Sequence, residues 1–283
     1  MVRVTVSLRD ACYMSCMLSI LLLEWNVGAD IAFEEQLKYL MWIGLWAAAT
    51  TGLSFVPFDE RCFVGETFTF KSCVVSMAQQ SCFVVMGLVM AVRLSGQKDL
   101  STKEWMLAGS GSQMPLERHV HYALIGSMFK DFWLAYDLET GFALHHVCTV
   151  MGCGMCLVLP VGFGAATLNA CQAEASSILY NCIFVLPVAV AGGRSFCKLV
   201  QWMYMVGMLA SHIVAAWIGL SFAVEFAPVG KSSDVWWTWW RITYVVLCVL
   251  IVVFRAGGQL LYSQRIIFED WSAALVEDIS KTK

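Results

Sequence analysis

Charged residues are scarce in this sequence. Only 14% of the 283 residues are Asp, Glu, Lys or Arg, whereas 59% are hydrophobic. An ordinary globular domain has about 25% charged and about 45–50% apolar residues. One water-soluble core could not enclose this much apolar surface, so the composition predicts a chain that uses the lipid bilayer as its solvent.

Runs of basic residues are also absent. The chain has 18 Lys and Arg against 21 Asp and Glu, a formal net charge of −3. Binding to nucleic acid needs a basic patch that neutralises phosphates. Nucleic acid is therefore excluded as a partner, which leaves membrane lipids and other membrane protein subunits.

Histidine is too rare for the spaced histidine boxes of membrane di-iron enzymes, since the chain has only five. A zinc ion on His145, His146 and a carboxylate would have suitable ligand types. Adjacent helical residues point about 100° apart, however, and make a poor chelate. The Cys153-x-x-Cys156 pair lies in an apolar run and has no second pair at metal spacing. No metal and no resident cofactor are expected.

Long apolar runs divide the rest of the chain into membrane spans. Seven are predicted, at Tyr39–Val56, Ser72–Val92, His119–Asp137, Phe142–Phe163, Glu174–Ala191, Val200–Val224 and Val235–Phe254. The predicted fold class is all-α, a polytopic transmembrane helix bundle. Its predicted divisions are an N-terminal segment (1–38), a first full span and loop (39–71), a membrane domain (72–254) and a polar tail (255–283).

Two segments outside these spans have features of their own. The apolar stretch Ala11–Leu23 is short for a span, and three alternatives stay open: a short span, a re-entrant or surface helix, or the apolar region of a targeting peptide. The polar, glycine-containing stretch Arg93–Arg118 is predicted to be an exposed loop.

Ionisable residues cluster in the third and fourth predicted spans. Lys130 and Asp131 lie in the middle of one, and His145 and His146 near the start of the next. A charge at mid-bilayer costs about 2.5–3.5 kcal/mol on insertion scales, so such residues indicate function. A helix–short turn–helix connection would bring Asp131 and a histidine to the same depth. The alternative is a locally neutralised Lys130–Asp131 pair.

The next span begins with a polar stripe. Glu174, Ser177 and Asn181 recur at helical spacing and share one face. Together with Asp131 and the histidines they predict a polar cavity among three consecutive helices. The alternative is that these groups form only interhelical hydrogen bonds, worth about 0.6 kcal/mol each on average.

These residues form a pattern that resembles the TLC domain, which is shared by ceramide synthases, translocation-associated membrane proteins and other lipid-related proteins. The resemblance covers roughly Ser72–Phe254. Its specific elements are Gly126-x-x-x-x-Asp131, His145-His146-x-x-Thr149 and Glu174-x-x-Ser177-x-x-x-Asn181.

The stripe of Glu174, Ser177 and Asn181 is most similar to the TLC proteins that are not ceramide synthases, and the chain departs from the family pattern in two places. Ceramide synthases carry His-Asp-x-x-Asp after the paired histidines, where this chain has Ala173-Glu174-Ala-Ser-Ser177. Many relatives also have a histidine where this chain has Gln79 and Gln80.

The resemblance implies a protein of the endoplasmic reticulum or a related endomembrane, with a lipid- or acyl-chain-binding cavity and a role in lipid homeostasis. The alternative location is the membrane of another organelle. Whether it is an enzyme stays open. If it is, the implied reaction is acyl transfer from acyl-coenzyme A, as co-substrate, to a lipid amine or hydroxyl. The alternative is a non-catalytic structural or accessory subunit of a membrane complex.

The site residues of the enzyme reading have separate roles. His145 or His146 would serve as general base or transient acyl acceptor, with Asp131 orienting the imidazole. Glu174 would hold the polar end of the acceptor. The other candidate binding residues are Lys130, Thr149, Ser177 and Asn181.

Overall fold

The structure is a computed structural model, and its elements fall into two compact units. It describes residues 7–28, 31–53, 55, 62–63, 68–96, 101–110, 115–134, 140–158, 162–189, 199–210, 213–214 and 217. The first unit comprises Met1–Val75 and Val85–Ala170, and the second Ser76–Val84 and Cys171–Lys283. The predicted span Val235–Phe254 and the polar tail lie outside the described residues.

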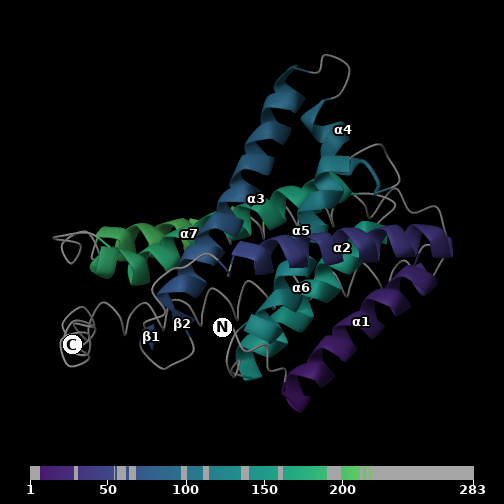
Figure 1. Cartoon of the computed structure of the whole chain (residues 1–283). Helices are drawn as coiled ribbons and strands as arrows, with labels where there is room; N and C mark the ends of the chain where they lie inside the picture. The colour runs from purple at the N-terminus through teal and green to yellow at the C-terminus, as the bar shows by residue number, and fades with distance from the viewer. Residues whose placement is uncertain are drawn as a thin grey trace. The chain divides into compact units, whose positions relative to one another are not determined.

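Four long helices build most of the first unit (Figure 1). They are α1 (Leu8–Gly28), α2 (Phe33–Leu53), α5 (Pro115–Leu134) and α6 (Thr140–Val158). Helix α5 packs against both α2 and α6, and α1 packs along α6. Side chains at every position of α5 from 120 to 128 are buried, so α5 is the central helix of this unit.

Helix α1 is longer than the apolar stretch that predicted it. It buries Met17, Leu21 and Trp25, which recur every four residues and form one face. A Cβ on Gly154 of α6 would clash with Leu21 and Glu24, so the two helices approach closely at this point. These contacts make α1 a packed member of the helix bundle.

Glycine also sets the distance between α2 and α5. A Cβ on Gly126 would lie 2.7 Å from the carbonyl oxygen of Ile43 and 2.9 Å from the backbone nitrogen of Ala47. Real Cβ atoms do not come this close to backbone. Gly126, the first residue of the Gly126-x-x-x-x-Asp131 motif, therefore has a packing role in the structure.

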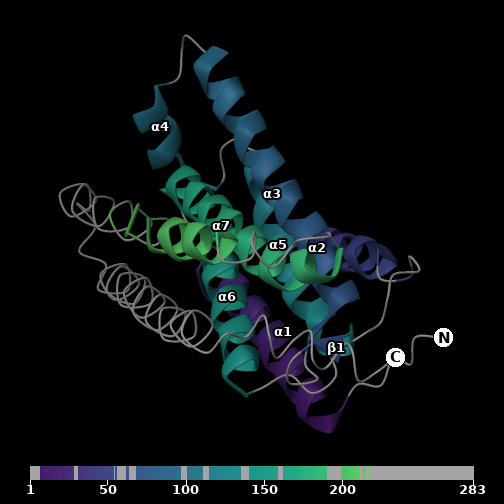
Figure 2. The same ribbon diagram turned by 90° about the vertical axis from the view of Figure 1, so that its left-hand side faces the viewer.

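The stretch predicted to be an exposed loop is partly buried and partly helical (Figure 2). It contains α4 (Thr102–Leu107), which lies beside the C-terminal half of α3 (Phe70–Gly96). Ser101 and Glu104 form a capping box at the start of α4. Trp105 is 2% exposed, and its backbone lies against Gly164 at the start of α7. The prediction of an exposed loop was wrong because it rested on the polar composition of the whole stretch, whereas one buried tryptophan anchors the stretch to the protein.

Helix α7 (Phe163–Ala189) begins well before the span predicted at Glu174. Gly162 has φ 84, a left-handed conformation that glycine adopts without strain, and marks the break after α6. Hydrogen bonds from Gly162 and Phe163 to the carbonyls of Leu107 and Ala108 fix the start of α7 beside the end of α4.

The second unit contains part of α3, most of α7 and the helix Leu199–Ala210. The rings of Tyr180 and Tyr204 lie 5.5 Å apart and join α7 to the last described helix. One face of that helix is buried, with Gln201, Tyr204 and Met208.

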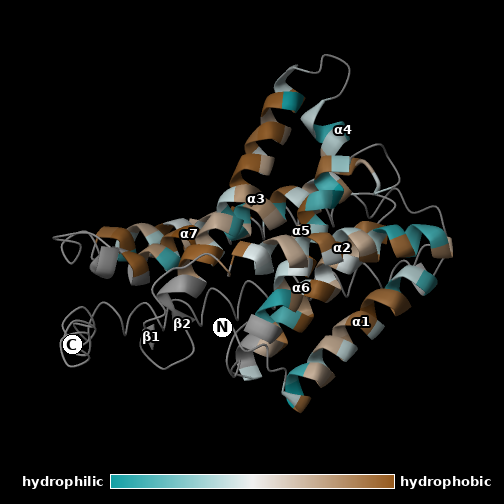
Figure 3. Ribbon diagram, viewed as in Figure 1, coloured by the Kyte–Doolittle hydropathy of each residue, from teal (hydrophilic) through white to brown (hydrophobic). Residues whose placement is uncertain are grey.

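The described regular structure is helical except for one short antiparallel pair of strands, each of two residues. They are β1 (Cys62–Phe63) and β2 (Phe68–Thr69). The prediction of an all-α protein is thereby confirmed for this part of the chain. Within it, Cys73–Gly96 is the one helix long and apolar enough to cross a membrane by those two criteria. Apolar residues run along the C-terminal half of α3 (Figure 3). The polytopic membrane bundle stays a prediction.

We expect Gly126→Ala to destabilise the protein by about 1–3 kcal/mol, because the added methyl group overpacks the contact with α2. Gly44→Ala is the matched control: nothing lies within 4 Å of its Cβ position, and alanine favours a helix over glycine by about 1 kcal/mol. Chemical unfolding followed by circular dichroism measures both. Equal effects of the two substitutions would contradict the close packing at Gly126.

The capping box predicts a local pH dependence. The backbone N–H of Ser101 donates to the Glu104 carboxylate at 2.8 Å and holds the pKa of that carboxyl below its ordinary value. A lowered pKa means that the cap stabilises α4 above the ordinary carboxyl pKa and is lost as pH falls through the lowered one. The amide shift of Ser101 in NMR should titrate with that lowered midpoint, and Glu104→Gln should abolish the titration. An ordinary midpoint would refute the capping contact.

Candidate functional site

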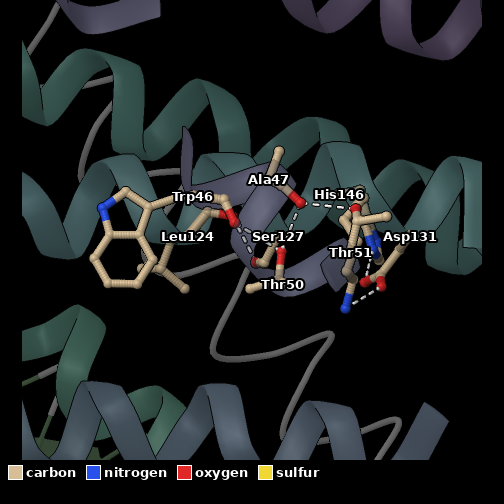
Figure 4. A network of polar contacts seen from close by, with 9 residues as sticks. Trp46, Ala47, Thr50, Thr51, Leu124, Ser127, Asp131 and His146 are labelled. Carbon is tan, nitrogen blue, oxygen red and sulfur yellow. Dashed lines mark hydrogen bonds and ion pairs between the residues drawn. The ribbon is translucent and has the colours of Figure 1, made fainter. Parts of the chain in front are cut away.

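Asp131 and His146 meet at the interface of α5 and α6 (Figure 4). Nε2 of His146 lies 2.9 Å from Oδ2 of Asp131. A carboxylate can only accept, so Nε2 carries the proton and donates it to Asp131. The short connection between α5 and α6 brings the two side chains together, as the sequence predicted for Asp131 and one of the histidines.

Lys130 binds the other oxygen of the same carboxylate. Its Nζ lies 2.8 Å from Oδ1 of Asp131. Lys130 and His146 are buried, whereas the side chain of Asp131 is 29% exposed. The Lys130–Asp131 pair is electrically neutral, which permits its burial in an apolar bundle. The sequence alternatives of a neutralised pair and of an Asp–His contact are therefore realised together, on different oxygens of Asp131.

Residues of α1, α2 and α5 lie close to this pair. The ring of Phe132 packs edge-on against His146 with centroids 5.6 Å apart, and Tyr13 of α1 stacks on Phe132 at 5.9 Å. Thr50 and Thr51 of α2 belong to the same polar network (Figure 4). Neither threonine was among the site residues predicted from the sequence. The only signal for them there is a Thr-Thr pair inside an apolar run.

His145 has a different environment from His146. The two rings lie 5.8 Å apart and nearly perpendicular, at 88°. His145 is half-buried, whereas His146 is 1% exposed. Thr149, the third element of the paired-histidine motif, donates its hydroxyl to the carbonyl of His145 at 2.9 Å. The structure thus selects His146 as the histidine that Asp131 orients, through a carboxylate–imidazole contact of the kind that fixes a tautomer.

The polar stripe of α7 makes its contacts in the second unit. The side-chain amide of Asn181 donates to Oε1 of Gln80 at 2.9 Å and to the carbonyl of Ser177 at 3.0 Å. Glu174 is buried on the same helix. Gln80 of α3 thus binds Asn181 of the stripe. The predicted convergence of Glu174 on Asp131 stays a prediction.

Among the described residues, no group of three or more His, Cys, Asp or Glu side chains is arranged to hold a metal ion. A carboxylate–imidazole pair in an apolar bundle can accept or donate a proton and can orient a nucleophile. The chemistry open to Asp131 and His146 is proton transfer.

Comparisons with protein-family models, curated proteins and solved structures find no match to this chain. The resemblance to the TLC domain therefore stays a prediction.

We expect Asp131→Asn to lower the free energy of unfolding by roughly 1–3 kcal/mol, less than the about 3–5 kcal/mol of a fully buried pair because Asp131 is partly exposed. Asparagine keeps an acceptor for His146 but leaves the buried charge of Lys130 without its counter-ion. Adding Lys130→Met should restore most of the loss.

The control for that series is Glu35→Gln. Lys38 and Glu35 form an ion pair on the exposed surface of α2, and its loss should leave the stability almost unchanged because solvent screens exposed pairs. Denaturant unfolding of the wild-type chain and of these three variants gives the comparison. A double variant no more stable than Asp131→Asn alone would show that the charge of Lys130 is not what Asp131 offsets.

Proposed function

We propose that this chain is a polytopic membrane protein whose helix bundle binds a lipid or acyl chain next to the Asp131–His146 pair. The observation that carries the proposal is that pair: a carboxylate and an imidazole 2.9 Å apart, supplied by two helices of a largely apolar bundle. Ionisable groups are rare in such surroundings unless they serve transport, binding or catalysis.

The outer faces of the helices support a membrane environment. Large hydrophobic side chains at least 38% exposed recur on α2, on the C-terminal half of α3 and on the last described helix. Examples are Leu37, Met41, Leu45, Val85, Leu88, Val92, Trp202, Met203 and Val206. Apolar surface of this extent indicates contact with lipid or with partner proteins. Membrane lipid and the endoplasmic reticulum or a related endomembrane are the environment that we infer.

The reaction that fits the pair is acyl transfer with His146 as general base. Since Nε2 of His146 donates to Asp131, the imidazole exchanges protons with a substrate through Nδ1. That nitrogen takes the proton of a lipid hydroxyl or amine as its oxygen or nitrogen attacks the thioester carbonyl of acyl-coenzyme A. The carbon–sulfur bond breaks and the thiolate leaves with the proton, giving the acylated lipid and free coenzyme A. The carboxylate of Asp131 stabilises the imidazolium formed in between.

A second function, as a structural or accessory subunit of a membrane complex, is favoured by a different observation. Lys130 already neutralises Asp131 at 2.8 Å, which suits a group whose task is to hold α5 in place. The exposed apolar faces would then contact other subunits. In that case the polar groups stabilise the bundle, and no substrate reaches them.

The test of the enzyme is acyl transfer by the purified chain, with labelled acyl-coenzyme A and a panel of lipid acceptors. His146→Ala should lower the rate by roughly 10²–10⁴-fold, the usual contribution of a general base. His145→Ala should cause a smaller loss, because it leaves the 2.9 Å contact between His146 and Asp131 in place. Circular dichroism establishes that each variant folds.

Two outcomes would refute the enzyme. One is undiminished acyl transfer by a folded His145→Ala, His146→Ala double variant. The other is stoichiometric co-purification of the wild-type chain with a large assembly, together with failure to bind acyl-coenzyme A, which would establish the accessory subunit.

A further inference from the structure

A second buried polar cluster lies at the start of α5, under α4. Glu117, in the first turn of α5, is 0% exposed. Its Oε1 accepts a hydrogen bond from the indole N–H of Trp105 at 2.9 Å and another from the guanidinium of Arg93. Residues of α3, α4 and α5 thus meet at one carboxylate.

His121 lies one helical turn after Glu117, on the same face of α5. Its Nε2 is 3.1 Å from the hydroxyl of Thr167, and its ring packs on Phe163 at 5.1 Å. The hydroxyl of Thr167 gives its single proton to the carbonyl of Phe163 at 2.8 Å. It can therefore only accept from His121, which fixes the proton on Nε2 and leaves Nδ1 as a bare acceptor.

Three polar atoms of this cluster are buried and, within the described part of the chain, have no hydrogen-bond partner. They are Oε2 of Glu117, Nδ1 of His121 and Nε of Arg93. Two of them are acceptors and one is a donor. Two of them belong to the Arg93–Glu117 ion pair, and the third belongs to His121, one helical turn after Glu117. Buried polar atoms are rarely left unpaired in folded proteins, so such a group indicates a binding position.

We propose that Glu117, His121 and Arg93 form a second polar site, which holds a small neutral group with two hydrogen-bond donors and one acceptor. The two donors bind Oε2 of Glu117 and Nδ1 of His121, and the acceptor binds the Nε–H of Arg93. The indole of Trp105 and the ring of Phe163, both buried, enclose the occupant. His121 precedes Asp131 by about 15 Å along α5, at a rise of about 1.5 Å per residue, so this site is separate from the Asp131–His146 pair.

The pattern of donors and acceptors selects the occupant. A lipid hydroxyl has one donor and would leave one acceptor unpaired, and an ammonium group has no acceptor for Arg93. A metal ion does not suit this site, because it would have only two ligands and the positive guanidinium of Arg93 would lie beside it. Water and a primary carboxamide both present two donors and one acceptor. They are the two sources of the chemistry that this site requires.

The first measurement determines where the protons are. Full-length protein with 15N-labelled histidine, in lipid nanodiscs, gives the protonation state of each ring nitrogen by NMR, and His121→Phe assigns the His121 signals. We expect Nδ1 of His121 to carry no proton and to accept a hydrogen bond from the occupant, which cross-peaks between the two would show. Thr167→Val removes the acceptor for Nε2–H, so the ring should change to the Nδ1–H tautomer and bind Glu117 directly. Thr149→Val, which removes a hydroxyl bonded to a helix carbonyl on α6, should leave the His121 signals unchanged.

The second measurement distinguishes the two sources. Acetamide is the probe, and N,N-dimethylacetamide, which lacks both N–H donors, is its matched control. A rise in the thermal unfolding midpoint with acetamide alone, lost in Thr167→Val, identifies a carboxamide site. Cross-peaks from Nδ1 to water with no response to acetamide identify a water site. A protonated Nδ1 in the wild-type chain, or a bare Nδ1 with neither cross-peaks nor a response to acetamide, overturns the proposal.

Discussion

The pairing of charged groups around α5 is the constraint on which the first unit depends. This helix is enclosed by other helices, yet it carries Glu117, Lys130 and Asp131. A charge in an apolar interior is tolerated only when a partner offsets its lost hydration. Asp131 obtains two partners, from α5 and α6, and Glu117 obtains Arg93 and Trp105. These pairings decide which faces of α6, α3 and α4 must turn toward α5.

Close packing at glycine supplies the second constraint. Gly126 brings α2 against α5, Gly154 brings α1 against α6, and Gly164 admits the backbone of Trp105. Each contact is between a helix and its neighbour in the first unit. Small residues at helix interfaces are typical of membrane bundles, where backbone approach and dispersion replace the hydrophobic effect between helices. The packing and the charge pairs therefore act on the same helices and fix the same arrangement.

Most of the long helices could be predicted from the sequence. The helical segments that were missed share one feature: no apolar run marks them. The apolar runs located α2, α3, α5 and α6 because hydropathy reports length and burial directly. It missed the first turns of α7, where Gly162 rather than a polar residue precedes the helix. It also missed α4, because a six-residue helix anchored by one tryptophan has no periodic signal. At the site, the proximity of Asp131 and a histidine followed from a short connection, whereas Thr51 came from a helix distant in sequence.

The sequence by itself determined the helical class, the apolar character of the helices and the positions of the ionisable residues within them, because all three follow from local composition and spacing. It did not determine which histidine Asp131 binds, that Lys130 takes the second carboxylate oxygen, or that His121 is held by Thr167 as one tautomer. Those depend on how helices rotate and cross, which is set by contacts between residues far apart in the chain. The sequence shows where the ionisable residues lie, but tertiary packing decided their partners. A hydrogen bond depends on distance and direction. Spacing along one helix gives neither quantity for side chains on two different helices.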